Sequence, residues 1–210
     1  MTIEYDNFLQ DCITNLPSST PMVVEPELAL VMRDFTQQTN AWRAMYEVPV
    51  NKELTCYVVT PMQGSSINLL HNLFEAEDPD RKPAAMGGVR MSTPGHIELE
   101  RPPSASALWI ADVSLYPTRN LTGPSSCKAA VPGWLLDRYY DTLLHGVLGR
   151  MMRQPLKPYS NLPLGSLHGA AYGAGRSAAK AELARSNIWG TQQWRFPPAG
   201  TARTDRQHWS

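Results

Sequence analysis

The best candidate for acid–base chemistry in this 210-residue chain lies in the stretch "HIELE". His96 alternates there with Glu98 and Glu100, and an imidazole beside carboxylates can exchange protons near neutral pH. The same alternation is typical of a half-exposed strand, with Ile97 and Leu99 on the buried face. We therefore expect a surface strand here and no catalytic residue.

The signatures of common enzymes and cofactor sites are missing from the sequence. It contains no GxSxG, HExxH, P-loop or dinucleotide glycine fingerprint. The stretch "GAAYGAG", residues 169–175, is rich in glycine but lies inside a helical pattern, so packing is the favoured interpretation. The histidines and the three cysteines are scattered without metal-ligand spacing, which predicts no metal site, no cofactor and no disulfide framework, and fits a reducing compartment.

Charge is distributed unevenly, although the whole chain is neutral. From residue 150 onward, nine Lys or Arg stand against two acids, so this part carries about +7 and the remainder about −7. Such asymmetry is typical of a face or tail that meets an oppositely charged partner, and a solvated basic face explains it equally well. The polar N-terminus predicts no signal peptide, and no window reaches the roughly 18 apolar residues of a membrane span.

Two helices and then a sheet are predicted for the first part of the chain. Apolar side chains recur at helical spacing over residues 3–16 and again over residues 25–45, where Pro26 suits a helix start. Between residues 48 and 115 the pattern changes to short apolar runs broken by Pro, Gly, Asn and Ser, which predicts a small antiparallel sheet of four to six strands. The clearest strand is "ALWIADVSLYP".

Two further helices are predicted over residues 132–154 and 164–187. The first has such a wide apolar arc that we expect it to be buried on two sides, at the centre of a bundle. The second has small residues at four-residue spacing. Because glycine costs about 1 kcal/mol relative to alanine inside a helix, such a row predicts close helix packing. These predicted packing positions are Gly165, Gly169, Gly173 and Ser177.

The last residues, 189–210, have no periodicity and are rich in Trp and Arg, the residue types enriched at interface anchors. They predict an extended arm that docks on a neighbouring subunit or another partner. Trp42 and Arg43 are weaker candidates for such contacts, because Trp42 fits a core position. The predicted contact residues of the arm are Trp189, Trp194, Arg195, Phe196, Arg203, Arg206 and Trp209.

The predicted fold class is α+β. We expect an antiparallel helical bundle with a small antiparallel β-sheet inserted between its N-terminal and C-terminal helix pairs, plus the extended C-terminal arm. The predicted divisions are the N-terminal helices at 1–46, the β insertion at 47–116, the connector and C-terminal helix hairpin at 117–188, and the arm at 189–210.

Four stretches together resemble the head-to-tail adaptor proteins of tailed bacteriophages, the connector or tail tubular protein A-like family. They are "PGWLLDRYYDTLLHGVLGRMM", the "QPLKPYSNLPL" corner, "HGAAYGAGRSAAKAELARSN" and "ALWIADVSLYPTRN", and the resemblance covers about residues 5–188. It implies a structural virion protein of the neck or tail, not an enzyme, that is assembled in the bacterial host cytoplasm. The implied partners are further copies in a dodecameric ring, the capsid portal protein and a downstream nozzle or tube protein, with genomic DNA passing through without sequence-specific binding and no membrane.

Three alternatives stay open. Another phage neck, head-completion or tail-terminator ring protein has a similar content of helices and strands. A small-molecule-binding bundle or an enzyme would use the central helix, through Tyr139, Tyr140, Asp141 and His145. A nucleic-acid-binding module would lose affinity steeply as the salt concentration rises, and it would depend on Arg176, Lys180 and Arg185.

Overall fold

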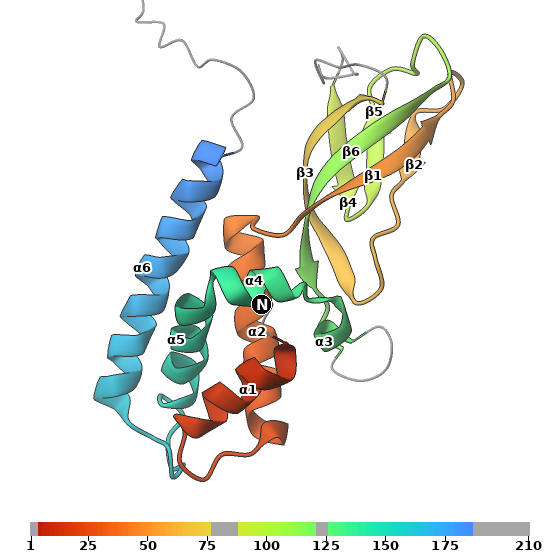
Figure 1. Ribbon diagram of the computed structural model, residues 1–210. Coiled ribbons are helices and arrows are strands. Elements are labelled where there is room, and N and C mark those ends of the chain that lie inside the picture. The colour runs from red at the N-terminus through yellow and green to blue at the C-terminus, as the bar shows by residue number, and fades with distance from the viewer. Residues whose placement is uncertain (1–3, 77–87, 121–125, 187–210) are drawn as a thin grey trace, which may run out of the picture.

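The structure is a computed structural model that describes residues 4–76, 88–120 and 126–186, and it has a helical half and a sheet half (Figure 1). Figure 1 shows α6 at the outer edge of the helical half, where it packs along α5 and α2. The helices are α1 (Tyr5–Thr14), α2 (Pro21–Thr39), the single-turn α3 (Cys127–Ala130), α4 (Gly133–Arg138), α5 (Tyr140–Met151) and α6 (Leu162–Ser186).

The sheet half consists of two antiparallel three-stranded sheets that enclose one core. The strand order is β1-β6-β3 in one sheet and β2-β5-β4 in the other. Their inner faces share an apolar cluster that includes Val48, Ile67, Ile97 and Leu115. The strands are β1 (Arg43–Val50), β2 (Cys56–Val58), β3 (Ser65–Glu75), β4 (Val89–Thr93), β5 (His96–Leu99) and β6 (Ala107–Pro117).

The predicted architecture, a helical bundle with one small inserted sheet, is wrong. Helices and strands are interleaved along the chain, with α1 and α2 before β1–β6 and the remaining described helices after them. The strands form two sheets rather than one, because the inward side chains of β5 and β6 face each other and bury a core of their own. β4 is short, and its sequence "VRMST" alternates Val89 and Met91, which pack against the core of the sheet half, with polar residues.

The second helix begins earlier and ends earlier than predicted. α2 starts at Pro21, and it stops at Thr39 because Asn40 adopts the left-handed conformation, with φ 55°. Asparagine tolerates this conformation better than other residues with a side chain. The chain then enters β1, where the sequence pattern predicted helix as far as residue 45.

The helix predicted over residues 132–154 is broken at Tyr139, whose backbone has φ −114° and ψ 26°. The Tyr139 side chain is buried, and its ring lies 4.8 Å from that of Phe35 on α2. This contact fixes the point at which the chain turns from α4, which runs across the helical half, into α5 (Figure 1).

The core of the helical half is built mainly by α1, α2, α4 and α5, and it includes Ala179 of α6. Large apolar side chains from α1, α2, α4 and α5 are fully buried, and burying one such side chain contributes about 1.5–3 kcal/mol. α5 itself packs against α2 and against α6. Representative core residues are Phe8, Leu28, Phe35, Leu136 and Leu143.

A polar network joins the two halves where α2 meets the sheet. The Asn40 side-chain oxygen accepts hydrogen bonds from the Asn68 amide at 2.8 Å and from the Ser114 hydroxyl at 2.9 Å. Beside it, the Arg43 guanidinium pairs with the buried carboxylate of Asp112. Buried polar groups need such partners, so this network fixes how β1 and β6 leave the helical half.

Candidate interaction surfaces

The contact between α5 and α6 is unusually close because glycines face it from both helices. A Cβ atom added at Gly149 would lie 2.8 Å from the backbone nitrogen of Gly169, which is too close for any side chain. At Gly146 an added Cβ would lie 2.6 Å from Val31 and 2.9 Å from the ring of Tyr172. The glycines of α5 were not singled out from the sequence, although the spacing of "GVLG" puts both on one helix face.

The predicted row of small residues on α6 only partly faces α5. Gly165 and Gly169 lie under the side chain of Arg153, whereas an added Cβ at Gly173 would meet nothing within 4 Å. Ser177 is exposed, and its hydroxyl donates to the carbonyl of Gly173. Four-residue steps rotate about 40° on a helix with 3.6 residues per turn, so the row winds away from the interface.

Polar pairs hold α6 along the rest of its inner face. The Asp34 carboxylate of α2 accepts hydrogen bonds from the Tyr172 hydroxyl at 2.6 Å and from the Arg176 guanidinium at 2.8 Å. Burial, followed by the hydrogen bond to Asp34, raises the pKa of Tyr172. A salt bridge between Arg138 and Glu182 ties α4 to the other end of the helix.

A histidine pair adds a further contact between α5 and α6. The Nδ1 atoms of His145 and His168 are 2.8 Å apart, so they share one hydrogen bond in which one nitrogen donates and the other accepts. This bond cannot form when both rings are protonated. Partial burial, and then the neighbouring His145, lower the pKa of His168.

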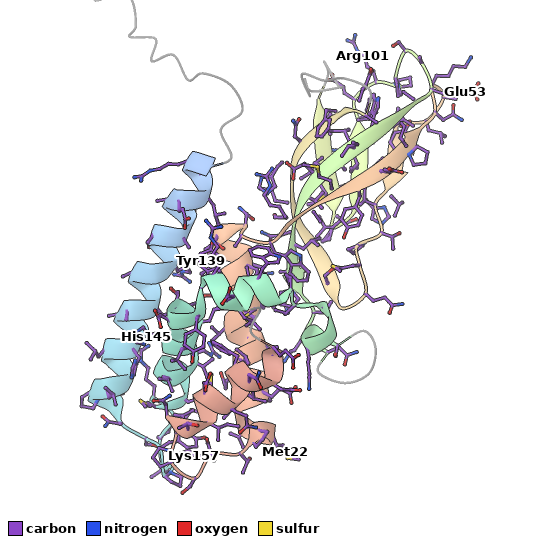
Figure 2. All side chains as sticks on the ribbon, in the orientation of Figure 1. Met22, Glu53, Arg101, Tyr139, His145 and Lys157 are labelled. Carbon is purple, nitrogen blue, oxygen red and sulfur yellow. The ribbon has the colours of Figure 1, made fainter. Side chains whose placement is uncertain are left out.

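The central-helix residues of the small-molecule alternative do not gather around one pocket. Tyr139 is buried, Tyr140 donates to Asp11 of α1 at 3.0 Å, and Asp141 is exposed (Figure 2 labels Tyr139 and His145). A cavity of about 190 Å³ lies between α2, α5 and α6, with Gly146 and Tyr172 in its wall. Its volume is below the roughly 300–1,000 Å³ of typical ligand pockets.

The His96, Glu98 and Glu100 cluster lies on β5 and the residue that follows it. The carboxylate of Glu98 pairs with Arg90 of β4, and hydrogen bonds from Ser92 and Arg90 lower the pKa of Glu98. Within residues 4–76, 88–120 and 126–186, no group of three or more His, Cys, Asp or Glu could hold a metal ion. Over the same residues, no helix is long and apolar enough to cross a membrane.

The basic residues proposed for nucleic-acid binding differ in their exposure and in their contacts within the chain. Arg176 is engaged with Asp34, whereas Lys180 and Arg185 are exposed near the end of α6. Trp42 is buried in the core of the sheet half, and its neighbour Arg43 pairs with Asp112.

The predicted contact residues of the arm, from Trp189 to Trp209, lie outside the described residues. α6, the last described element, ends at Ser186 on the side of the helical half away from the corner at residues 152–161 (Figure 1). No model of a known protein family and no curated protein matches this sequence.

One exposed feature was not anticipated from the sequence. The corner between α5 and α6 carries Leu156, whose side chain is 100 % exposed. Figure 2 shows the neighbouring Lys157 and Met22, which is 85 % exposed, at the same end of the helical half. An apolar residue inside a loop gives no periodic signal, so only the structure reveals that it points into solvent.

Proposed function

We propose that this chain is a structural virion protein, a head-to-tail adaptor that forms a ring beneath the capsid portal of a tailed bacteriophage. The ring continues the DNA channel and offers a platform to the downstream tail protein. Genomic DNA passes through without sequence-specific binding, and the chain catalyses no reaction. The resemblance of the α5–corner–α6 stretch to this family supports the proposal, and the surface of α6 supports assembly from several copies.

The observation that carries the proposal is the outer face of α6, which consists of Leu167, Ala170, Ala174, Ala178 and Ala181. These exposed residues recur at three- and four-residue steps and lie opposite the α5 contact. No Asp, Glu, Lys or Arg occurs between Leu162 and Gly175. Small apolar side chains allow another helix to approach closely, and the charge-free part of this face, from Leu167 to Ala174, is typical of a protein–protein contact. Its other end, at Ala178 and Ala181, lies beside Glu182 and Arg185.

Charge separation supports a head-to-tail contact between copies. The part of the chain from residue 150 onward carries about +7 and the rest about −7. Two of these basic residues, Arg150 and Arg176, already pair with Glu27 and Asp34 within one copy. The exposed Lys180 and Arg185 are left to meet acidic residues of a neighbouring copy. Contacts between unlike surfaces close into rings when the rotation between copies permits.

The outer face of α6 can be tested by a charge placed at its centre. Ala174→Glu is expected to leave the fold intact, because the Ala174 side chain is exposed, and to abolish ring formation on a purified portal ring. Ala174→Ser is the matched control and should assemble like the wild type. Negative-stain imaging and circular dichroism give the two readouts. Normal rings from the folded Ala174→Glu variant would contradict the proposal that the outer face of α6 joins copies in the ring.

The predicted arm provides a separate test of portal docking. Deletion of residues 189–210 removes none of the described core, so the truncated chain should fold. We expect it to lose affinity for the portal ring, since the Trp and Arg anchors lie in the deleted segment. A truncated chain that binds portal like the full chain would assign docking to another surface.

A further inference from the structure

His145 of α5 and His168 of α6 face each other across the contact between these two helices. Their Nδ1 atoms are 2.8 Å apart, their ring centroids are 4.9 Å apart, and both side chains are partly buried. The residues are 23 positions apart in the sequence, so no local spacing reveals the pair. Each neutral ring has a lone pair on one nitrogen, and two Nδ1 lone pairs at this distance need a proton or a metal cation between them.

The backbones that carry the two histidines are held at a fixed separation. Gly149 lies one turn after His145 and contacts α6 directly. A Cβ atom added there would lie 3.2 Å from the carbonyl carbon of His168 and 2.8 Å from the backbone nitrogen of Gly169. Ligands carried by two rigid helices are preorganised, so little conformational freedom is lost when they bind an ion.

The separation of the two Nδ1 atoms is close to that of two imidazole ligands on one metal ion. Zn²⁺ holds histidine nitrogens at about 2.0–2.1 Å, so two of them in tetrahedral positions lie about 3.4 Å apart. Small rotations of the two side chains are enough to reach this spacing from the observed 2.8 Å. Imidazole suits Zn²⁺, Ni²⁺ and Cu²⁺, whereas Mg²⁺ and Ca²⁺ prefer oxygen ligands.

The surroundings favour the neutral rings that bind metal. Partial burial, and then His145, lower the pKa of His168, so its Nδ1 lone pair is available at neutral pH. Asp141, one turn before His145, is exposed and adds a negative charge on the same helix face. The Arg153 guanidinium lies over Gly169 and opposes this effect. Because no group of three His, Cys, Asp or Glu forms a site within the described part of the chain, water completes the coordination.

We propose that His145 and His168 bind one divalent transition-metal ion, of the class of Zn²⁺, through their Nδ1 atoms. In the metal-free chain a proton lies between the rings. When the ion binds, this proton moves to Nε2 of its own ring, so both Nδ1 lone pairs reach the metal and no proton is released. The ion clamps α6 against α5, where Ala179 is the one buried hydrophobic side chain of α6 among the described residues. The inference does not depend on the adaptor proposal.

The test titrates Zn²⁺ into the full chain at pH 7.5, after metal has been removed with a chelator. Calorimetry should give one ion per chain. At a zinc concentration of about 100 times Kd, the melting temperature should rise by at least about 5 °C, and Mg²⁺ should not change it. His145→Gln and His168→Gln should each bind Zn²⁺ at least about tenfold more weakly, because loss of a ligand costs at least as much as loss of an outer-sphere partner. His96→Gln, at an exposed histidine of β5, is the matched control and should bind like the wild type.

Nitrogen NMR of the wild-type imidazole rings covers the case in which a variant does not fold. Added Zn²⁺ should shift the Nδ1 signals of two of the five histidines and leave the others unchanged. Binding that stays within twofold of the wild type in both pair variants, or that is lost in His96→Gln, would overturn the inference. A wild type whose melting temperature and imidazole signals do not respond to Zn²⁺ would equally overturn it and leave the pair as a hydrogen bond alone.

Discussion

α5 and α6 lie side by side, yet they are attached to the fold by different means. α5 places Leu143, Val147 and Met151 in the core, where each is fully buried. α6 contributes Ala179 as its one buried hydrophobic side chain among the described residues, and otherwise depends on glycine contacts and polar pairs. α5 therefore uses its apolar surface to stabilise the fold, whereas α6 leaves much of its own exposed.

The largest expected difference between the two helices concerns leucine truncation. Leu143→Ala should lower the free energy of unfolding by about 2–5 kcal/mol, because it removes fully buried side-chain volume from the core. Leu167→Ala on α6, where the side chain is 66 % exposed, should change it by less than about 0.5 kcal/mol. Urea unfolding of the monomer measures both values. Similar losses would contradict the difference drawn between α5 and α6.

A smaller effect is expected from adding a methyl group at the glycines. Gly149→Ala forces α6 away from α5, because the new Cβ would meet the backbone of Gly169, and it should cost about 1–3 kcal/mol. Gly173→Ala is the matched control. Its Cβ meets nothing within 4 Å, so the better helix propensity of alanine should stabilise the protein by up to about 1 kcal/mol. Equal changes in the free energy of unfolding for the two variants would show that close glycine packing does not hold α6 against α5.

The smallest expected effect is a dependence on pH through the histidine pair. The folded pKa of His168 is lowered by burial and by His145, so the unfolded chain binds the proton more readily. The stability contributed by neutral His168 is fully present above the unfolded pKa of about 6.5. It is lost as the pH falls through the lower folded pKa. The loss in stability between pH 7.5 and pH 5.5 should therefore be smaller in a His145→Gln, His168→Gln double variant than in the wild type. An equal loss in both proteins would exclude the pair as its cause.

How far the sequence predicted this structure depends on where the deciding interactions lie. α6 was predicted to within two residues at its start and one at its end, because its pattern and its Asn161 cap are local. The end of α2 was missed because Asn40 is fixed by Asn68 and Ser114, which are far away in the sequence. The residues from Trp42 to Met45 kept helical spacing and therefore concealed the start of β1.

For the candidate surfaces, too, the sequence predicted local features and missed those that depend on the folded arrangement. The row of small residues on α6 was visible in the sequence, but which of its members face α5 depends on the helical twist and on Gly149 of the neighbouring helix. The exposure of Leu156 follows from hydrogen bonds within a loop, which leave no periodic pattern. The arm remains a prediction, since its residues lie outside the described part of the chain.

The adaptor proposal is tested most directly by the mass of the purified chain, alone and mixed with a purified portal ring, using light scattering with negative-stain imaging. We predict a chain that joins the portal as a closed ring of several copies on one face. A chain that remains monomeric and ignores the portal would contradict the proposal and shift attention to the residues around Tyr139 and His145.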